Sequence, residues 1–135
     1  MPTDCVIDTH ALLWFQEGNP KLGVSVRKIL SDPTSILVLP VIALAEACWI
    51  VNKGRTNIPS VSVLLQTIDA DTRVSIIPLT REIVKLTLRM PDELEMHDRQ
   101  IIATGIFLDK QGRCSTLLTK DAKINKSGLL PVVWQ

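Results

Sequence analysis

The stretch CVIDTHALLW, which runs from Cys5 to Trp14, contains the two patterns that decide the fold. Residues 3–8 are dominated by an uninterrupted apolar run, which is typical of a short β-strand buried on both faces. Residues 10–16 have the length and spacing of a helix, and Asp8 or Thr9 is placed to act as its N-cap. The chain therefore begins with a buried strand that leads directly into a helix.

The same succession continues along the rest of the chain. We expect further strands at residues 36–39, 74–77, 115–118 and 132–134, and helices at residues 25–30, 41–53, 60–69, 80–90 and 98–108. Apolar strands that alternate with helices predict an α/β protein with a mainly parallel sheet covered on both faces. The chain has 135 residues, no internal repeat and no long linker, so we expect one domain over residues 1–135.

The composition excludes several classes of protein. The formal net charge is +1, so contact with a polyanion would have to be local or mediated by a metal ion. The three cysteines, Cys5, Cys48 and Cys114, have no C-x-x-C spacing and argue against a disulfide framework or a zinc site. We expect a soluble cytoplasmic domain, because we see no signal peptide and no apolar run approaches the roughly 20 residues that cross a bilayer.

Four acidic residues lie at the edge of, or inside, hydrophobic segments, where a lone carboxylate is costly to desolvate: Asp8, Glu46, Asp98 and Asp121. In a parallel sheet the site lies outside the carboxyl ends of the strands, so the fold allows all four to converge there. Packed carboxylates repel one another, and a shared divalent cation would relieve that repulsion. Mg²⁺ or Mn²⁺ prefers such oxygen ligands and activates a water for attack on a phosphodiester. Glu46 or Asp98 is a candidate to orient or deprotonate that water.

Each carboxylate also has a simpler interpretation. Asp8 suits a helix N-cap, and Asp98 suits the first turn of a helix. Asp121 suits a turn after a strand. Glu46 has no evident polar helix face to use, and its simpler alternative is a buried salt bridge with Lys53 or Arg99. Four such signals together favour a metal site.

Several motifs resemble the PIN-domain ribonucleases, specifically the VapC-type toxins of prokaryotic toxin–antitoxin pairs. The likeness covers nearly the whole chain. It rests on DTHALLW at residues 8–14, AE at 45–46, NKGR at 52–55, IPLT at 77–80, HDR at 97–99, IAT at 102–104, LTKD at 118–121 and VVW at 132–134. Each motif alone is weak, but their order and spacing together are specific.

The resemblance implies a PIN-like three-layer α/β/α sandwich and a Mg²⁺- or Mn²⁺-dependent endoribonuclease. The acidic residues of the family carry over onto Asp8, Glu46, Asp98 and Asp121, and Thr119 matches the family's hydroxyl residue near the metal. The resemblance also implies a cognate small antitoxin that inhibits the enzyme, a homodimer, and a structured RNA such as tRNA or rRNA as the substrate.

Two alternatives stay open, a structure-specific DNA nuclease of the same fold and a non-catalytic PIN-like protein-binding module. The short chain without a strong basic patch argues against the first, and the four carboxylates argue against the second. One departure from the family is Gly105, where similar chains have alanine, and a glycine inside a helix costs up to about 1 kcal/mol.

Other residues have both a structural and a functional interpretation. The basic residues Lys53, Arg55, Lys120, Lys123 and Lys126 either contact RNA phosphates or are solvated surface charges. We expect His10 to pack beneath the first helix, the alternative being contact with substrate. We expect at least two of Trp14, Phe15 and Trp49 in the core, the alternative being a groove for an antitoxin helix or stacking on a base.

Overall fold

The computed structural model describes residues 3–135, and a five-stranded sheet lies at its centre. The strands are β1 (Thr3–Ile7), β2 (Ile36–Pro40), β3 (Val74–Ile77), β4 (Cys114–Leu118) and β5 (Val132–Val133). They lie in the order β3-β2-β1-β4-β5, and each neighbouring pair is parallel. The predicted parallel sheet is therefore confirmed.

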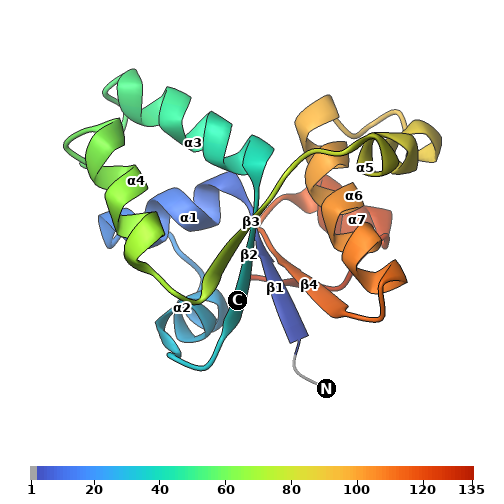
Figure 1. Ribbon diagram of the computed structural model, residues 1–135, viewed down its shortest axis with the longest axis horizontal. Helices are drawn as coiled ribbons and strands as arrows, with labels where there is room; N and C mark the ends of the chain where they lie inside the picture. Colours follow the sequence, from blue (N-terminus) through green and yellow to red (C-terminus); the bar gives the residue numbers. More distant parts are fainter. Residues whose placement is uncertain (1–2) are drawn as a thin grey trace.

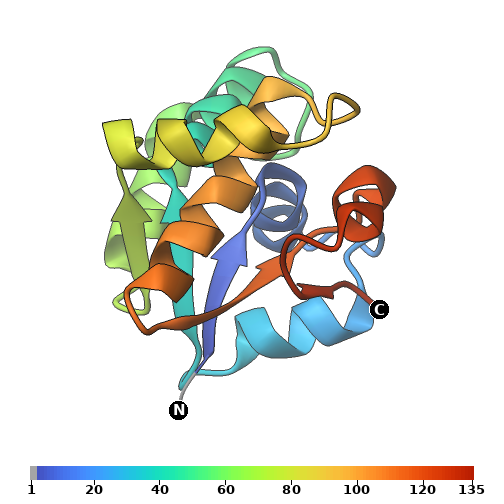
Figure 2. The ribbon, with the colours of Figure 1, turned by 90° about the vertical axis from the view of Figure 1, so that its right-hand side faces the viewer.

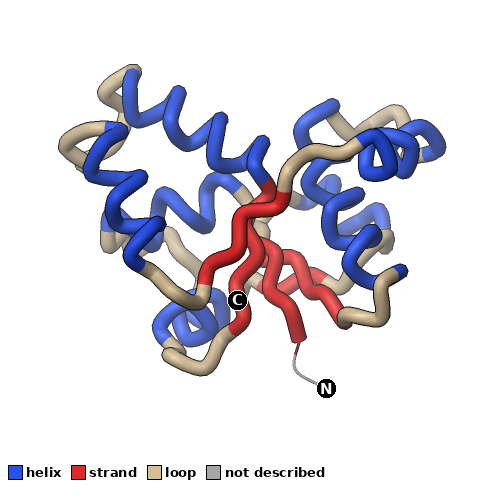
Figure 3. Tube along the Cα trace, viewed as in Figure 1, coloured by secondary structure: helices blue, strands red, loops and turns tan. Residues whose placement is uncertain are grey.

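Helices form a layer on each face of this sheet (Figures 1 and 3). They are α1 (Thr9–Glu17), α2 (Val24–Ser31), α3 (Val41–Asn52), α4 (Val61–Ala70), α5 (Arg81–Leu86), the 3₁₀ helix η1 (Thr87–Arg89), α6 (Met96–Lys110) and α7 (Ala122–Ser127). In Figure 1 the sheet is seen edge-on, with α1 to α4 on its left and α5 to α7 on its right. This is the predicted three-layer α/β/α sandwich. None of the described helices is long and apolar enough to cross a membrane.

The middle of the sheet is the core of the molecule. Val6 of β1, Val38 of β2 and Leu117 of β4 are completely buried. Such strands are covered by helices on both faces, which explains why their sequences are continuously apolar. The edge strand β3 is different, because its Ile76 is 41% exposed. Of the cysteines, Cys5 is buried, Cys48 is half-buried and both are free, while the side chain of Cys114 lies outside the described part of the structure.

Two predicted elements differ from the structure. The helix predicted over residues 80–90 is shorter, because α5 ends at Leu86 and the chain tightens into η1, where the Thr87 hydroxyl donates to the carbonyl of Val84 at 2.6 Å. The helix α7 was not predicted, since its sequence AKINKS is short and polar. Its start is nevertheless well defined, because Asp121 caps it.

The order of the strands places two chain segments side by side at the carboxyl edge of the sheet. From β1 the chain moves outward through β2 to β3, and then returns to the other side of β1 to form β4 and β5. Figure 2 shows β1 next to β4. Ligands of open parallel sheets bind where the strand order reverses in this way. The residues that follow β1 and β4 are Asp8 and Thr119, so the topology alone brings two predicted site residues together.

Candidate metal centre and nuclease site

Asp8 follows β1 directly and serves as the N-cap of α1. Its Oδ1 accepts a hydrogen bond from the Ala11 amide at 2.8 Å, and the Thr119 hydroxyl lies close to its carboxylate. The residue is only 8% exposed. Burial therefore raises the pKa of Asp8, and the nearby charge of Asp121 raises it further, while the hydrogen bonds and His10 act in the opposite direction. The capping and site interpretations of Asp8 are thus compatible.

Asp121 lies shortly after the end of β4 and is the N-cap of α7. Its Oδ1 accepts from the amides of Lys123 at 2.8 Å and Ile124 at 3.1 Å. The amide of Asp121 in turn donates to Oγ1 of Thr119 at 3.1 Å, and Thr119 is 1% exposed. This buried hydroxyl thus contacts both Asp8 and Asp121 and fixes their relative position.

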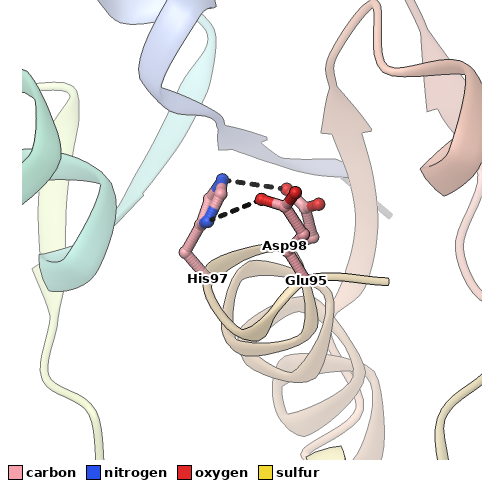
Figure 4. A group of neighbouring side chains, drawn as sticks. All are labelled: Glu95, His97 and Asp98. Atoms are coloured by element: carbon pink, nitrogen blue, oxygen red, sulfur yellow. Dashed lines mark ion pairs between the residues drawn. The ribbon is translucent and has the colours of Figure 1, made fainter. Parts of the chain in front are cut away.

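Asp98 reaches the same place from the first turn of α6, where it is 8% exposed. Burial raises the pKa of Asp98, His97 lowers it, and the charges of Asp121 and Glu95 raise it. Oδ1 of Asp98 lies 3.2 Å from Nε2 of His97, and Nδ1 of the same ring lies 3.9 Å from Oε2 of Glu95 (Figure 4). The start of α6 therefore presents two acidic groups and one imidazole to the site.

Glu46 approaches from α3, on the other side of the sheet. Its side chain is one-third exposed, and its Oε2 lies 3.8 Å from Nε2 of His97. The predicted alternative of a salt bridge with Lys53 or Arg99 is wrong, since neither pair is found among the described residues. Arg99 instead donates from its guanidinium to the carbonyls of Leu94 and Pro91, at 2.8 and 3.0 Å. Arg99 therefore stabilises the segment that precedes α6.

These side chains line one cavity of about 420 Å³. All four predicted carboxylates and Thr119 contribute to it, together with two residues that were not predicted, the α6 N-cap Glu95 and His97 of α6. Their signal in the sequence was the grouping EMHD at residues 95–98. Ligand atoms of Glu95, His97 and Asp98 lie within 4.8 Å of one another, and among the described residues this is the one group of three or more that could share a metal ion in the present geometry. Asp8, Glu46 and Asp121 line the same cavity but lie outside this group.

The donor set fits a hard divalent cation. Asp8 and Asp98 are buried carboxylates with raised pKa values, and the charge of Asp121 opposes the ionisation of both. A cation would remove this repulsion, and carboxylate and hydroxyl oxygens are the ligands that Mg²⁺ and Mn²⁺ prefer. Thr9 also lines the cavity, and its buried Oγ1 has no hydrogen-bond partner among the described residues. Unsatisfied buried oxygens at a cavity wall are consistent with an ion or water there.

Positive charges form part of the rim. Lys120 and Lys123 line the cavity, and Nζ of Lys120 lies 4.4 Å from the centre of the Trp14 ring. His10 also lines it, is exposed, and lies edge-on to Trp14, so the expectation that it packs beneath the first helix is wrong. Lys126 is exposed and does not line the cavity. A phosphate group is attracted to such a rim, while a cation is attracted to the acidic floor.

Comparisons with known proteins agree with this geometry. The sequence model of the PIN domain matches residues 5–128. No curated protein sequence matches the chain significantly. Two solved structures that share its fold are VapBC2 from Rickettsia felis bound to a promoter DNA fragment, and a toxin–antitoxin complex from Klebsiella pneumoniae. The first gives a TM-score of 0.70 at 16% identity, covering 98% of this chain and 100% of the other. The second gives 0.65 at 20% identity, covering 96% and 95%.

The family match spans most of the chain, and the sheet order, the helical layers and the acidic cavity accompany it. The protein therefore belongs to the PIN domain family, a family of nucleases.

Proposed function

We propose that the protein is a Mg²⁺- or Mn²⁺-dependent endoribonuclease and the toxin component of a toxin–antitoxin pair. The observation that carries this proposal is the convergence of Asp8, Glu46, Asp98 and Asp121 on one cavity at the reversal point of the sheet. Structural residues of one domain have no reason to concentrate four carboxylates in this way, because desolvation and mutual repulsion both cost free energy.

In this proposal Asp8, Asp98 and Asp121 hold the divalent cation, directly or through water, and Glu46 is a further ligand or orients the attacking water. When bound, the cation supplies charge neutralisation for the phosphodiester and its leaving group. Glu46 is suited to accept a proton because its side chain is 33% exposed, whereas Asp8 and Asp98 are buried, and because it enters from the opposite wall. Thr119 acts as a positioning residue, since its hydroxyl contacts Asp8 and accepts from the Asp121 amide.

The basic rim orients the substrate in the same proposal. Lys120 and Lys123 bind phosphates next to the scissile one, and Trp14 restrains Lys120 through its contact with the ring. His10 is placed to make a further polar contact with the substrate. None of these residues distinguishes RNA from DNA by itself, so the choice of RNA rests on the likeness to VapC-type toxins.

The partners follow from the same likeness. The two similar structures are toxin–antitoxin complexes, which supports a small cognate antitoxin as the inhibitor of this chain. The proposal further includes a homodimer that acts in the cytoplasm. Its target is a structured RNA such as tRNA or rRNA.

The proposal is tested with two labelled oligonucleotides of one sequence, one of RNA and one of DNA, each incubated with Mn²⁺ or with EDTA. Cleavage of RNA that requires the metal is the expected result. Cleavage of DNA alone would identify the DNA nuclease alternative. A folded protein that binds no Mn²⁺ and cuts neither strand would identify the non-catalytic binding module.

A further inference from the structure

We propose that Trp49, Lys53 and Arg55 form a second nucleotide-binding subsite, in which the Trp49 indole stacks on an unpaired base of the RNA. We call these three residues the Trp49 platform. The inference rests on the proposed ribonuclease function. It assigns a binding position to an RNA base beside the cleavage site.

The exposure of Trp49 is the first observation. Its side chain sits on α3 and the residue is 53% exposed, whereas Trp14 and Phe15 are partly buried against the core. Among the large hydrophobic residues that are strongly exposed in the described part of the chain, it is the one aromatic. Tryptophan is enriched at interfaces, where its large ring contacts a ligand or a partner.

The position of Trp49 relative to the cavity is the second observation. Glu46 lines the cavity, and Trp49 follows it by three residues on the same helix. Side chains three apart in a helix are neighbours on one face, and the rise between them is about 4.5 Å. Trp49 therefore lies next to Glu46 on one face of α3, just beyond the residues that line the cavity.

Charge is the third observation, and it selects the kind of ligand. Nζ of Lys53 and Cζ of Arg55 each lie 5.4 Å from the centre of the Trp49 ring. Neither cation makes an ion pair with an acidic side chain within residues 3–135. An apolar protein surface docking here would bury two cations without partners, whereas an RNA strand brings its own phosphates. An aromatic ring flanked by free cations is the arrangement that single-strand binding proteins use.

The chemistry of stacking restricts the RNA conformation. In a duplex the faces of each base are covered by its neighbours, so the indole has no access to them. The Trp49 platform therefore requires at least one unpaired nucleotide near the scissile bond. We expect single-stranded RNA and loops to bind more tightly than a blunt duplex of the same length.

The experiment measures binding separately from cleavage. A short fluorescently labelled single-stranded RNA is titrated with the whole protein in EDTA, and its anisotropy gives the Kd. Trp49→Ala and Trp49→Leu should each raise the Kd by about 5-fold or more, while Trp49→Phe should stay near the wild type, because only the aromatic variant keeps a stacking face. Leu88→Ala is the matched control, since Leu88 is 74% exposed and lies on η1, outside the platform. Thermal unfolding of each variant verifies that it is folded.

The two cations have a readout of their own. Lys53→Ala and Arg55→Ala should each reduce the dependence of log Kd on log salt by roughly one unit, because each removes about one phosphate contact. Lys28→Ala, in the last turn of α2, should leave that slope unchanged.

The inference and the proposed function fail in different ways. If Trp49→Leu binds as tightly as the wild type while Trp49→Ala does not, Trp49 makes a plain apolar contact, and the stacking subsite is refuted. The stacking subsite is also refuted if all three Trp49 variants bind RNA with the same affinity as the wild type, even where cleavage is intact. If the wild type binds RNA in a Trp49-dependent way but does not cleave it with Mn²⁺, the proposed nuclease function is refuted while the base-stacking subsite is supported.

Discussion

Nε2 of His97 lies 3.2 Å from Oδ1 of Asp98, so an imidazole stands between the acidic centre and the wall formed by α3. The same nitrogen is 3.8 Å from Oε2 of Glu46. His97 thus lies between the acidic groups of α3 and α6, within ion-pair distance of both.

His97→Ala should weaken Mn²⁺ binding by about 10-fold, which is typical when a side chain that orients a ligand is lost. Isothermal titration calorimetry measures the change, with Asp98→Asn as the reference for removal of a ligand. A loss as complete as that of Asp98→Asn would make His97 itself a ligand, through the group that it forms with Glu95 and Asp98. An unchanged affinity would show that the contact is incidental.

Metal binding should depend on pH in a definite direction. Burial raises the pKa values of Asp8 and Asp98 in the folded protein above those of ordinary carboxyl groups. Without metal, the two groups therefore favour folding at low pH, where they are protonated. That contribution to stability is lost as the pH rises from the ordinary carboxyl range through the raised pKa values. Protons and the cation compete for the same oxygens. The increase in Tm caused by Mn²⁺ should therefore grow with pH across this window. Thermal unfolding with and without Mn²⁺ measures it, and an increase that is equal at every pH would contradict the assignment.

Thr119 should matter for stability as well as for activity. Thr119→Val keeps the shape of the side chain but removes the hydroxyl that contacts Asp8 and accepts from the Asp121 amide. We expect a loss of about 1–3 kcal/mol in the free energy of unfolding, because buried groups lose their partner. Denaturant unfolding measures it, and Thr119→Ser, which keeps the hydroxyl, should recover most of the loss. Equal stability of the valine and serine variants would show that the hydroxyl is not used.

The sequence predicted most of the fold because its strands are buried on both faces and therefore continuously apolar. The sequence also singled out Glu46 as a candidate site residue, since α3 has no polar face on which a carboxylate is expected, and Glu46 does line the cavity. The position of His97 between Glu46 and Asp98 was not predictable. Its contact with Glu46 joins residues 51 positions apart and depends on how α3 and α6 face each other. The exposure of Trp49 was equally hidden, since an apolar helix of twelve residues does not reveal which side chains remain uncovered.

The contact between Gly105 and Leu130 was likewise not predictable from the sequence. In a helix an alanine is favoured over glycine by about 1 kcal/mol, but a Cβ on Gly105 would overlap Cδ1 of Leu130. Leu130 is itself buried, so overpacking of about 1–3 kcal/mol should outweigh the gain, and Gly105→Ala should destabilise the protein. In a Leu130→Ala background the overlap is absent, and the same substitution should become stabilising. Denaturant unfolding of the four proteins tests this, and a Gly105→Ala effect that is the same in both backgrounds would contradict it.

The central claim is that the four converging carboxylates carry out metal-dependent cleavage of RNA. Its most direct test is incubation of total RNA with the purified, antitoxin-free protein and Mn²⁺, comparing the wild type with Asp98→Asn and with Asp69→Asn, an exposed aspartate of α4. We predict discrete fragments with the wild type and Asp69→Asn, and none with Asp98→Asn or with EDTA. Full cleavage by a folded Asp98→Asn variant would contradict the account.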